Sequence, residues 1–448
     1  MAEQTLNAKQ VASMLVSTSC GVGFLLGTGE LALRHGMAAC LYAVATAFGL
    51  IVLGSCAPHL WAGRKTVWSR MQELYGHSLG HSVALLSLVW MTGVLAAQIR
   101  GGSAVLALAG FPPASAMLLV VSFLLALSLV SLAGLSACFA VCIIACNVLL
   151  VRSLVVAGGL SVWIRAPASF VDAIHHSAPS HTGFVFLSVA AMVIGGADYQ
   201  QFALAARGPS EARMGCFLAA VVVFTVGFLP ASAVIAAGVT QGWLMTGDSV
   251  QAVPALLIHS LARGAHPVVR DVVVVALVTT ALGSASAILR AMSEATASLS
   301  RISFFRPMWS RALPLLFGLL VASRPESLVD MMVDLNTVYI AAIGPLLALT
   351  LLRVRVPDAA AKAAMGTACI LSLGSYLVRW TAAISLPESA PLIVSFLAGL
   401  AVALVYRPRA LPLSSNARLS NTAPGGTSSL AHPSAASSSS PADDAGGG

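Results

Sequence analysis

SCGVGFLLGTGE occupies residues 19–30, in the first long apolar segment of the chain. Glycines cluster near the middle of that segment, and a carboxylate, Glu30, follows them. Inside a helix, glycine costs about 1 kcal/mol relative to alanine and permits backbone conformations that other residues avoid. The cluster therefore predicts a helix that unwinds within about one turn of Gly21–Gly23.

A second segment repeats this arrangement, since residues 193–201 read VIGGADYQQ. Here Gly195 and Gly196 precede Asp198. Unwound backbone at membrane depth is tolerated only where it lines a cavity or is buried in protein, and broken helices there expose groups that bind substrates and ions. Close packing of helices through small residues would also explain Gly23 and Gly27. The matched positions and adjacent acids favour two broken helices that face each other across a central cavity.

The composition places these segments in a membrane. The chain has 448 residues, of which 58% are hydrophobic and 9% are charged, whereas soluble domains carry about 25% charged residues. We therefore expect an all-α, polytopic membrane protein that is not an enzyme. The net charge of +8 does not indicate a nucleic-acid partner, because the basic residues lie at the ends of the apolar segments.

Apolar runs predict about twelve transmembrane helices, since each needs about 20 residues. They lie near residues 10–33, 37–62, 81–110, 115–133, 136–163, 183–206, 213–240, 268–300, 312–323, 328–352, 363–384 and 390–406. The connections at 164–182 and 241–267 carry apolar residues of their own, and we expect surface helices there.

The broken segments are the first and the sixth span, which are corresponding members of two sets of five helices. This predicts a transmembrane domain at residues 1–410, with a first repeat at 10–163, a second at 183–353 and two extra helices at 363–406. Residues 411–448 turn to Ser, Ala, Pro and Gly, which predicts a disordered cytoplasmic tail. Most basic residues fall on the side of the N-terminus, so the positive-inside rule places both termini in the cytoplasm of a cell-membrane protein.

Polar groups inside the spans are the candidate binding residues. Glu30 and Asp198 each cost at least about 2.5 kcal/mol to place in hydrocarbon, so each is expected to face a cavity or a partner. Either carboxylate is also a candidate proton carrier, and Asp198 is the more deeply placed of the two. The predicted substrate-binding set is Gly21, Gly23, Glu30, Gln98, Gly195, Gly196, Asp198, Tyr199 and Gln201.

Two stretches resemble the sodium:solute symporter family. Residues 197–213 read ADYQQFALAARGPSEAR and resemble the family signature at the end of helix 6, while residues 280–289 read TALGSASAIL and resemble its helix 8. The resemblance implies a LeuT-like fold of two inverted five-helix repeats. It also implies a sodium ion bound by the Ser284 hydroxyl, a Thr280 carbonyl and carbonyls near Ser19. Gly283 stands where the family has a further hydroxyl, which leaves proton coupling as the alternative.

Taken together, these features predict coupled transport of a small polar organic solute by alternating access. The two acids favour an amino-acid-like, zwitterionic or cationic solute. We expect no cofactor other than Na⁺ as a coupling ion, and the oligomeric state stays open. The alternatives are a membrane sensor that keeps the transporter fold and a proton-coupled amino-acid or nucleobase permease of a related family.

Overall fold

Apolar helices account for nearly all of the chain that can be described. The computed structural model describes residues 6–128, 132–241, 249–262, 267–299, 306–324, 328–352, 354–380, 389–405 and 409–410. Within these ranges, five helical stretches are long and apolar enough to cross a membrane: Val22–Gly63, His77–Leu108, Pro179–Leu204, Pro209–Gly238 and Arg270–Leu299. Shorter apolar helices accompany them. The predicted all-α membrane protein is confirmed, and its predicted tail, 411–448, lies outside the described residues.

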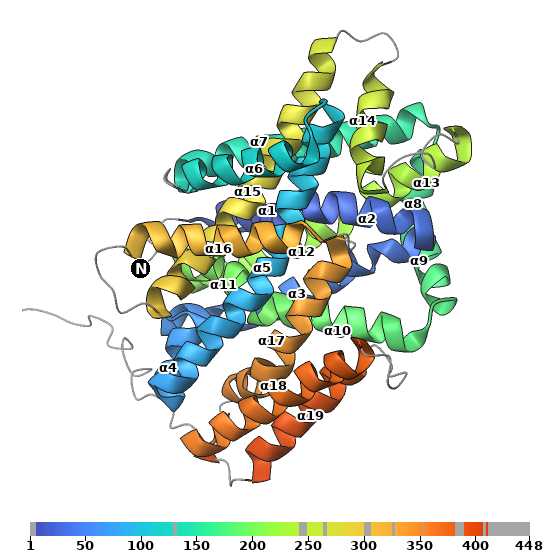
Figure 1. Cartoon of the computed structure of the whole chain (residues 1–448). Coiled ribbons are helices and arrows are strands. Elements are labelled where there is room, and N and C mark those ends of the chain that lie inside the picture. Colours follow the sequence, from blue (N-terminus) through green and yellow to red (C-terminus); the bar gives the residue numbers. More distant parts are fainter. Residues whose placement is uncertain are drawn as a thin grey trace, which may run out of the picture. The chain divides into compact units, whose positions relative to one another are not determined.

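The first predicted repeat contains the helices up to residue 164 (Figure 1). They are α1 (Ala8–Ser19), α2 (Val22–His35), the 3-10 turn η1 (Gly36–Cys40), α3 (Leu41–Gly63), α4 (Val67–Tyr75), α5 (His77–Leu108), α6 (Pro113–Leu127), α7 (Leu132–Val156) and α8 (Leu160–Ile164). The fifth span was predicted to continue to residue 163, but α7 ends at Val156. Gly158 follows with φ of +67°, a left-handed conformation in which glycine ends helices.

The second predicted repeat and the last two spans follow α9 (Ala166–His175). They comprise α10 (Pro179–Gly195), α11 (Ala197–Leu204), α12 (Pro209–Val226), α13 (Leu229–Gln241), η3 (Ser249–Gln251), α14 (Ala252–Ala262), α15 (Pro267–Leu299), α16 (Arg306–Ala322), α17 (Leu328–Leu351), α18 (Asp358–Trp380) and α19 (Ala390–Val405). The short strands β1 (Val354–Arg355) and β2 (Arg409–Ala410) pair antiparallel on either side of α18 and α19 in the sequence.

Local sequence explains where several helices begin and end. At the start of α1, the Asn7 side chain accepts a hydrogen bond from the Gln10 backbone, and the Gln10 side chain accepts one from the Asn7 backbone, both at 2.9 Å. This reciprocal capping satisfies two backbone donors of the first turn. The seventh predicted span is divided into α12 and α13, because Pro230 lacks a backbone N–H and its ring crowds the carbonyl four residues earlier.

The helices pack around α3, α5 and α15. α3 packs against α10 and α12, α5 packs against α15, α16 and α17, and α1 packs against α12 and α15. α18 and α19 lie side by side and both contact α17 (Figure 1). Large apolar side chains that stay exposed fall on outer faces, as Val141, Ile144 and Val148 do on α7. A lipid environment covers such faces.

One of the two predicted surface helices is buried instead. α9 is mostly exposed, as expected for the connection at 164–182. In the connection at 241–267, however, α14 packs against α2, α7 and α15, and its Val253 and Leu257 are fully buried. The prediction of a surface position for α14 was wrong. Gly29 of α2 has no side chain, which lets the Val253 side chain approach the α2 backbone closely.

Candidate functional site

The first span is broken where its glycines predicted. α1 ends at Ser19 and α2 begins at Val22, while Gly21 between them is extended, with φ of −59° and ψ of 172°. Helix ends leave backbone N–H and C=O groups without partners inside the helix. The break therefore places unpaired backbone donors and acceptors in the middle of a buried segment.

Gln98 of α5 supports this break. The Gly23 N–H donates to Oε1 of Gln98 at 3.0 Å, and the Gln98 residue is 2% exposed. A Cβ atom added at Gly21 would lie 3.0 Å from Nε2 of the same side chain. Gln98 therefore satisfies a first-turn donor of α2, which the helix itself cannot do. Its predicted contact with substrate stays a prediction.

Ser284 of α15 lies against the same break. A Cβ atom at Gly21 would lie 2.5 Å from the Ser284 Oγ, so only glycine fits between α15 and the unwound backbone. Ser284 is fully buried, and its Oγ has no hydrogen-bond partner among the described residues. A buried hydroxyl without a partner is costly, so this oxygen is available to a ligand.

The other two predicted ion-binding residues use their hydroxyls within the protein. Thr280 donates to the Ala276 carbonyl at 2.8 Å, and its Oγ1 lies 3.7 Å from the Cys146 sulfur. Ser19 donates to the Leu15 carbonyl at 2.8 Å. Backbone carbonyls can ligate cations whatever the side chain does, and the resemblance assigned a carbonyl role to Thr280. Among the three residues, Ser284 alone has a free hydroxyl.

The sixth span is broken at its glycines as well. α10 ends at Gly195 and α11 begins at Ala197, with Gly196 extended at φ of −70° and ψ of 128°. The carbonyls released here have protein partners: the Tyr339 hydroxyl donates to Gly195 at 2.8 Å, and Gln200 Nε2 donates to Ile194 at 2.8 Å. Both predicted breaks are therefore confirmed, and protein side chains stabilise the second one.

Asp198 sits at the start of α11 and is 1% exposed. Its carboxylate accepts hydrogen bonds from its own backbone N–H and that of Tyr199, in the first turn where a helix favours negative charge. The Oδ1 atom has no hydrogen-bond partner in the described structure. No described basic side chain forms an ion pair with Asp198.

Aromatic side chains from three helices lie within electrostatic range of Asp198 or beside it. A Cβ atom at Gly196 would lie 2.6 Å from Asp198 Oδ1 and 3.2 Å from Cζ2 of Trp90. The Trp90 and Tyr339 ring centroids are 5.8 Å apart, and Tyr42 and Tyr339 both interact electrostatically with the carboxylate. The Trp90 Nε1 is buried without a described partner. Sequence reasoning missed these three aromatic residues; the signal available was Trp90 deep inside a span rather than at its ends.

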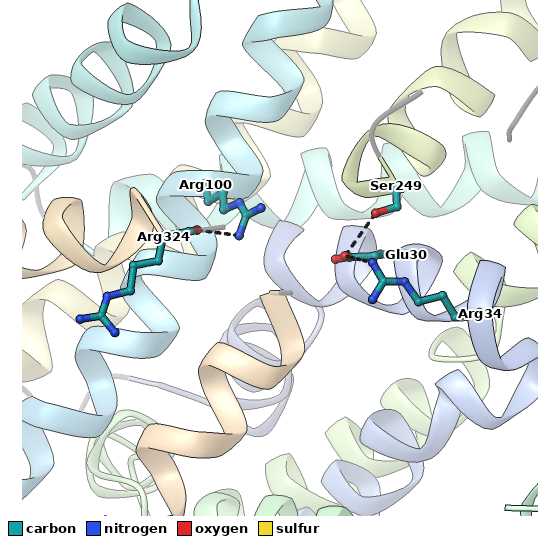
Figure 2. A network of polar contacts seen from close by, with 5 residues as sticks. All are labelled: Glu30, Arg34, Arg100, Ser249 and Arg324. Atoms are coloured by element: carbon teal, nitrogen blue, oxygen red, sulfur yellow. Dashed lines mark hydrogen bonds and ion pairs between the residues drawn. The ribbon is translucent and has the colours of Figure 1, made fainter. Parts of the chain in front are cut away.

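Glu30 belongs to a different cluster (Figure 2). Its Oε1 accepts a hydrogen bond from Ser249 at 3.2 Å and pairs with Arg34 at 3.5 Å, and the Glu30 residue is 3% exposed. Arg100 acts electrostatically on Glu30 and donates to the Arg324 carbonyl at 3.0 Å. The cluster links α2, η3, α5 and the end of α16. The two predicted acids therefore lie in separate clusters, and Arg100 is engaged near Glu30.

Tyr199 and Gln201 connect α11 to neighbouring helices. The Tyr199 side chain hydrogen-bonds with Ser19 at the end of α1. Gln201 Nε2 donates to the Asp198 carbonyl at 2.9 Å and to the Ala287 carbonyl of α15 at 3.4 Å. These contacts hold the two breaks and α15 together.

The chain before α1 is joined to the end of α11. Leu6 forms a β-bridge with Ala206: the Leu6 N–H donates to the Ala205 carbonyl at 3.2 Å, and the Arg207 N–H donates to the Leu6 carbonyl at 2.9 Å. Glu211, in the stretch that resembles the family signature, accepts a hydrogen bond from the Ala8 N–H at 2.6 Å. The signature carboxylate therefore caps the first helix.

Comparison with known proteins places this arrangement in a fold. No protein-family model matches the chain, and no curated protein matches its sequence. A Na⁺-coupled sialic acid symporter, substrate-bound and outward-open, superposes with a TM-score of 0.73 at 12% identity, over 91% of this chain and 92% of that one. A nucleobase-cation-symport-1 family transporter, closed with bromovinylhydantoin bound, gives 0.57 at 12% identity, over 90% and 92%.

A variant of the Eremococcus coleocola manganese transporter gives a TM-score of 0.51 at 14% identity, over 89% of this chain and 92% of that one. These matches confirm the predicted LeuT-like fold of a multi-pass membrane protein. All three matched proteins are transporters, and at 12–14% identity the likeness to them shows the fold. The resemblance to the sodium:solute symporter family in particular stays a prediction.

Proposed function

We propose that this protein is a secondary active transporter that moves a small polar organic solute by alternating access. The observation that carries the proposal is the pair of broken helices, at which Asp198 Oδ1 and Ser284 Oγ are buried without partners. A bound solute or ion would give both atoms a partner, and an ionisable residue inside a membrane commonly marks a functional site. The fold supports the same conclusion, because its solved neighbours are transporters.

The transporter has the two repeats and two additional helices that the sequence predicts. Residues 10–163 and 183–353 form the two repeats, and 363–406 provide two further helices. The protein crosses the cell membrane with both termini in the cytoplasm. Substrate lies between the two breaks, near Gly21, Gly23, Gln98, Gly195, Gly196 and Asp198, with Tyr199 and Gln201 supporting α11. Glu30 contributes to substrate binding from its separate cluster with Ser249 and Arg34.

The decisive experiment is uptake by the purified protein in liposomes. A panel of radiolabelled amino acids, quaternary amines, nucleobases, sugars and carboxylates is tested under an inward sodium gradient, an inward proton gradient, both and neither. Accumulation above equilibrium under one gradient supports the proposal and identifies the coupling ion. Equal uptake under all four conditions indicates facilitated diffusion, and no uptake of any solute favours a sensor with the transporter fold.

Sodium is the coupling ion that the Ser284 environment favours. Its free hydroxyl lies beside the unwound backbone after α1, and a hard cation binds to several oxygens. We expect Ser284→Ala to weaken the apparent sodium affinity about tenfold, since one lost ligand is worth on the order of 1–2 kcal/mol. Measurement of uptake rate against sodium concentration checks this result.

Ser286→Ala is the matched control. Ser286 is buried on the same helix, and its hydroxyl donates a hydrogen bond to the Gly283 carbonyl at 2.9 Å. It should leave the sodium dependence unchanged. If Ser284→Ala also leaves it unchanged while uptake follows a pH gradient, coupling is to protons. That outcome is the proton-coupled alternative, which Gly283 in place of a hydroxyl residue would explain.

A further inference from the structure

We propose that Asp198 together with Tyr42, Trp90 and Tyr339 forms a recognition site for an organic ammonium group, and that the solute also carries a hydrogen-bond acceptor. This inference rests on the proposed transport function and specifies its substrate class. It uses two unpaired atoms and the rings around them.

The charge of the solute follows from Asp198. This residue is 1% exposed, its Oδ1 has no partner among the described residues, and backbone N–H groups at the start of α11 donate to the carboxylate. The cationic side chains of Arg34 and Arg100 are engaged around Glu30 instead (Figure 2). A buried carboxylate is stabilised by a counter-charge, and a cationic solute would supply it.

The kind of cation follows from the rings. Trp90 lies against Gly196 next to the Asp198 carboxylate, and its ring centroid is 5.8 Å from that of Tyr339. Tyr42, on α3, interacts electrostatically with the same carboxylate. Tyr42 in turn is 5.8 Å from the Phe24 ring of α2. Aromatic faces attract ammonium groups, and tryptophan does so most strongly. A metal ion would need several oxygen ligands at this place, and Trp90 beside the carboxylate offers none.

The acceptor on the solute follows from the Trp90 indole. Its Nε1 is a donor only, it is buried, and it has no partner within the described residues. The unpaired acceptor of Asp198 and the unpaired donor of Trp90 both belong to groups beside Gly196. One solute with an ammonium group and a nearby hydroxyl or carboxylate would satisfy both atoms.

The test compares two probes that have the same shape but differ in charge. Choline carries a trimethylammonium group and a hydroxyl, and 3,3-dimethyl-1-butanol replaces its nitrogen with carbon. We expect choline to bind the purified full-length protein at least tenfold more tightly than the neutral alcohol, measured by thermal stabilisation over a concentration series. Asp198→Asn should abolish this preference. Trp90→Phe keeps the ring but removes the donor, and should weaken choline binding about threefold.

Two controls separate the possible results. Asp172→Asn removes an exposed carboxylate on α9 and should leave choline binding unchanged. Equal binding of both probes, or a choline preference that survives Asp198→Asn, overturns the proposal. Counterflow in liposomes tests transport independently: binding of choline without transport of any solute refutes the proposed function but not the ammonium site. Coupled transport that depends on Asp198 but is specific for a solute without a cationic group refutes the ammonium site alone.

Discussion

Replacing Asp198 with asparagine is expected to leave the protein folded and to lower solute uptake by at least about thirtyfold. The two side chains have nearly the same shape, so packing against Gly196 and Trp90 is retained. The charge, however, is lost, and a hydrogen bond to a charged group contributes about 2 kcal/mol. Initial uptake rates in liposomes, normalised to the amount of inserted protein, give the measurement.

The control for this loss is Asp172→Asn, which removes a negative charge from an exposed position on α9. Its uptake should match that of the wild type. Thermal unfolding of the detergent-purified variants shows whether Asp198→Asn is still folded. A folded Asp198→Asn protein that transports at the wild-type rate across pH 5 to 8 would show that the carboxylate is structural, and the binding site would then have to lie around Glu30 and Gln98.

Gly196→Ala is expected to abolish transport and to destabilise the protein. A Cβ atom at this position would lie 2.6 Å from the Met192 carbonyl and 2.6 Å from Asp198 Oδ1. The backbone carbonyl cannot move aside as a flexible side chain can, so α10 and α11 must separate. Overpacking of this kind costs about 1–3 kcal/mol, and the displaced Asp198 would no longer face the Trp90 ring.

Gly183→Ala provides the comparison on the same helix. A Cβ atom there meets nothing within 4 Å, and alanine is the better helix former. This variant should fold and transport like the wild type. The unfolding midpoint and the uptake rate are measured for both variants. If Gly196→Ala transports normally, the close approach at the second break is not required for function.

The two helix breaks were predictable because their signal is local. Gly21 and Gly196 stand in apolar segments where nothing else about the sequence calls for glycine, and the backbone unwinds at both. The signal for the division between α12 and α13 was also local, since Pro230 lies inside the predicted span at 213–240. The division was not predicted, because the apolar run continues without interruption on both sides of Pro230. The buried position of α14 was not predictable, because it depends on Gly29 of a distant helix.

The candidate site was predictable only in part. Asp198 stood out because a carboxylate in an apolar segment is rare. Tyr42 and Tyr339 gave no such signal, since aromatic residues are common in apolar helices, and the depth of Trp90 within its span did not link it to the other two, which are far apart in sequence. Ser284 was suggested by resemblance, whereas the engagement of Gln98 with Gly23 and of Glu30 with Ser249 arises from tertiary contacts alone. Residue type thus indicated which groups are costly to bury, and the fold decided which of them have partners.

The β-bridge between Leu6 and Ala206 has a mechanical consequence. The break at Cys20–Gly21 separates α1 from α2, and the break at Gly196 separates α10 from α11. At the ends remote from these breaks, the bridge joins the two half-helices to each other, and Glu211 of α12 caps α1 at Ala8. A movement of either half-helix about its break is therefore expected to carry the other half-helix with it. Bending at one helix break without bending at the other would first have to disrupt the bridge between Leu6 and Ala206.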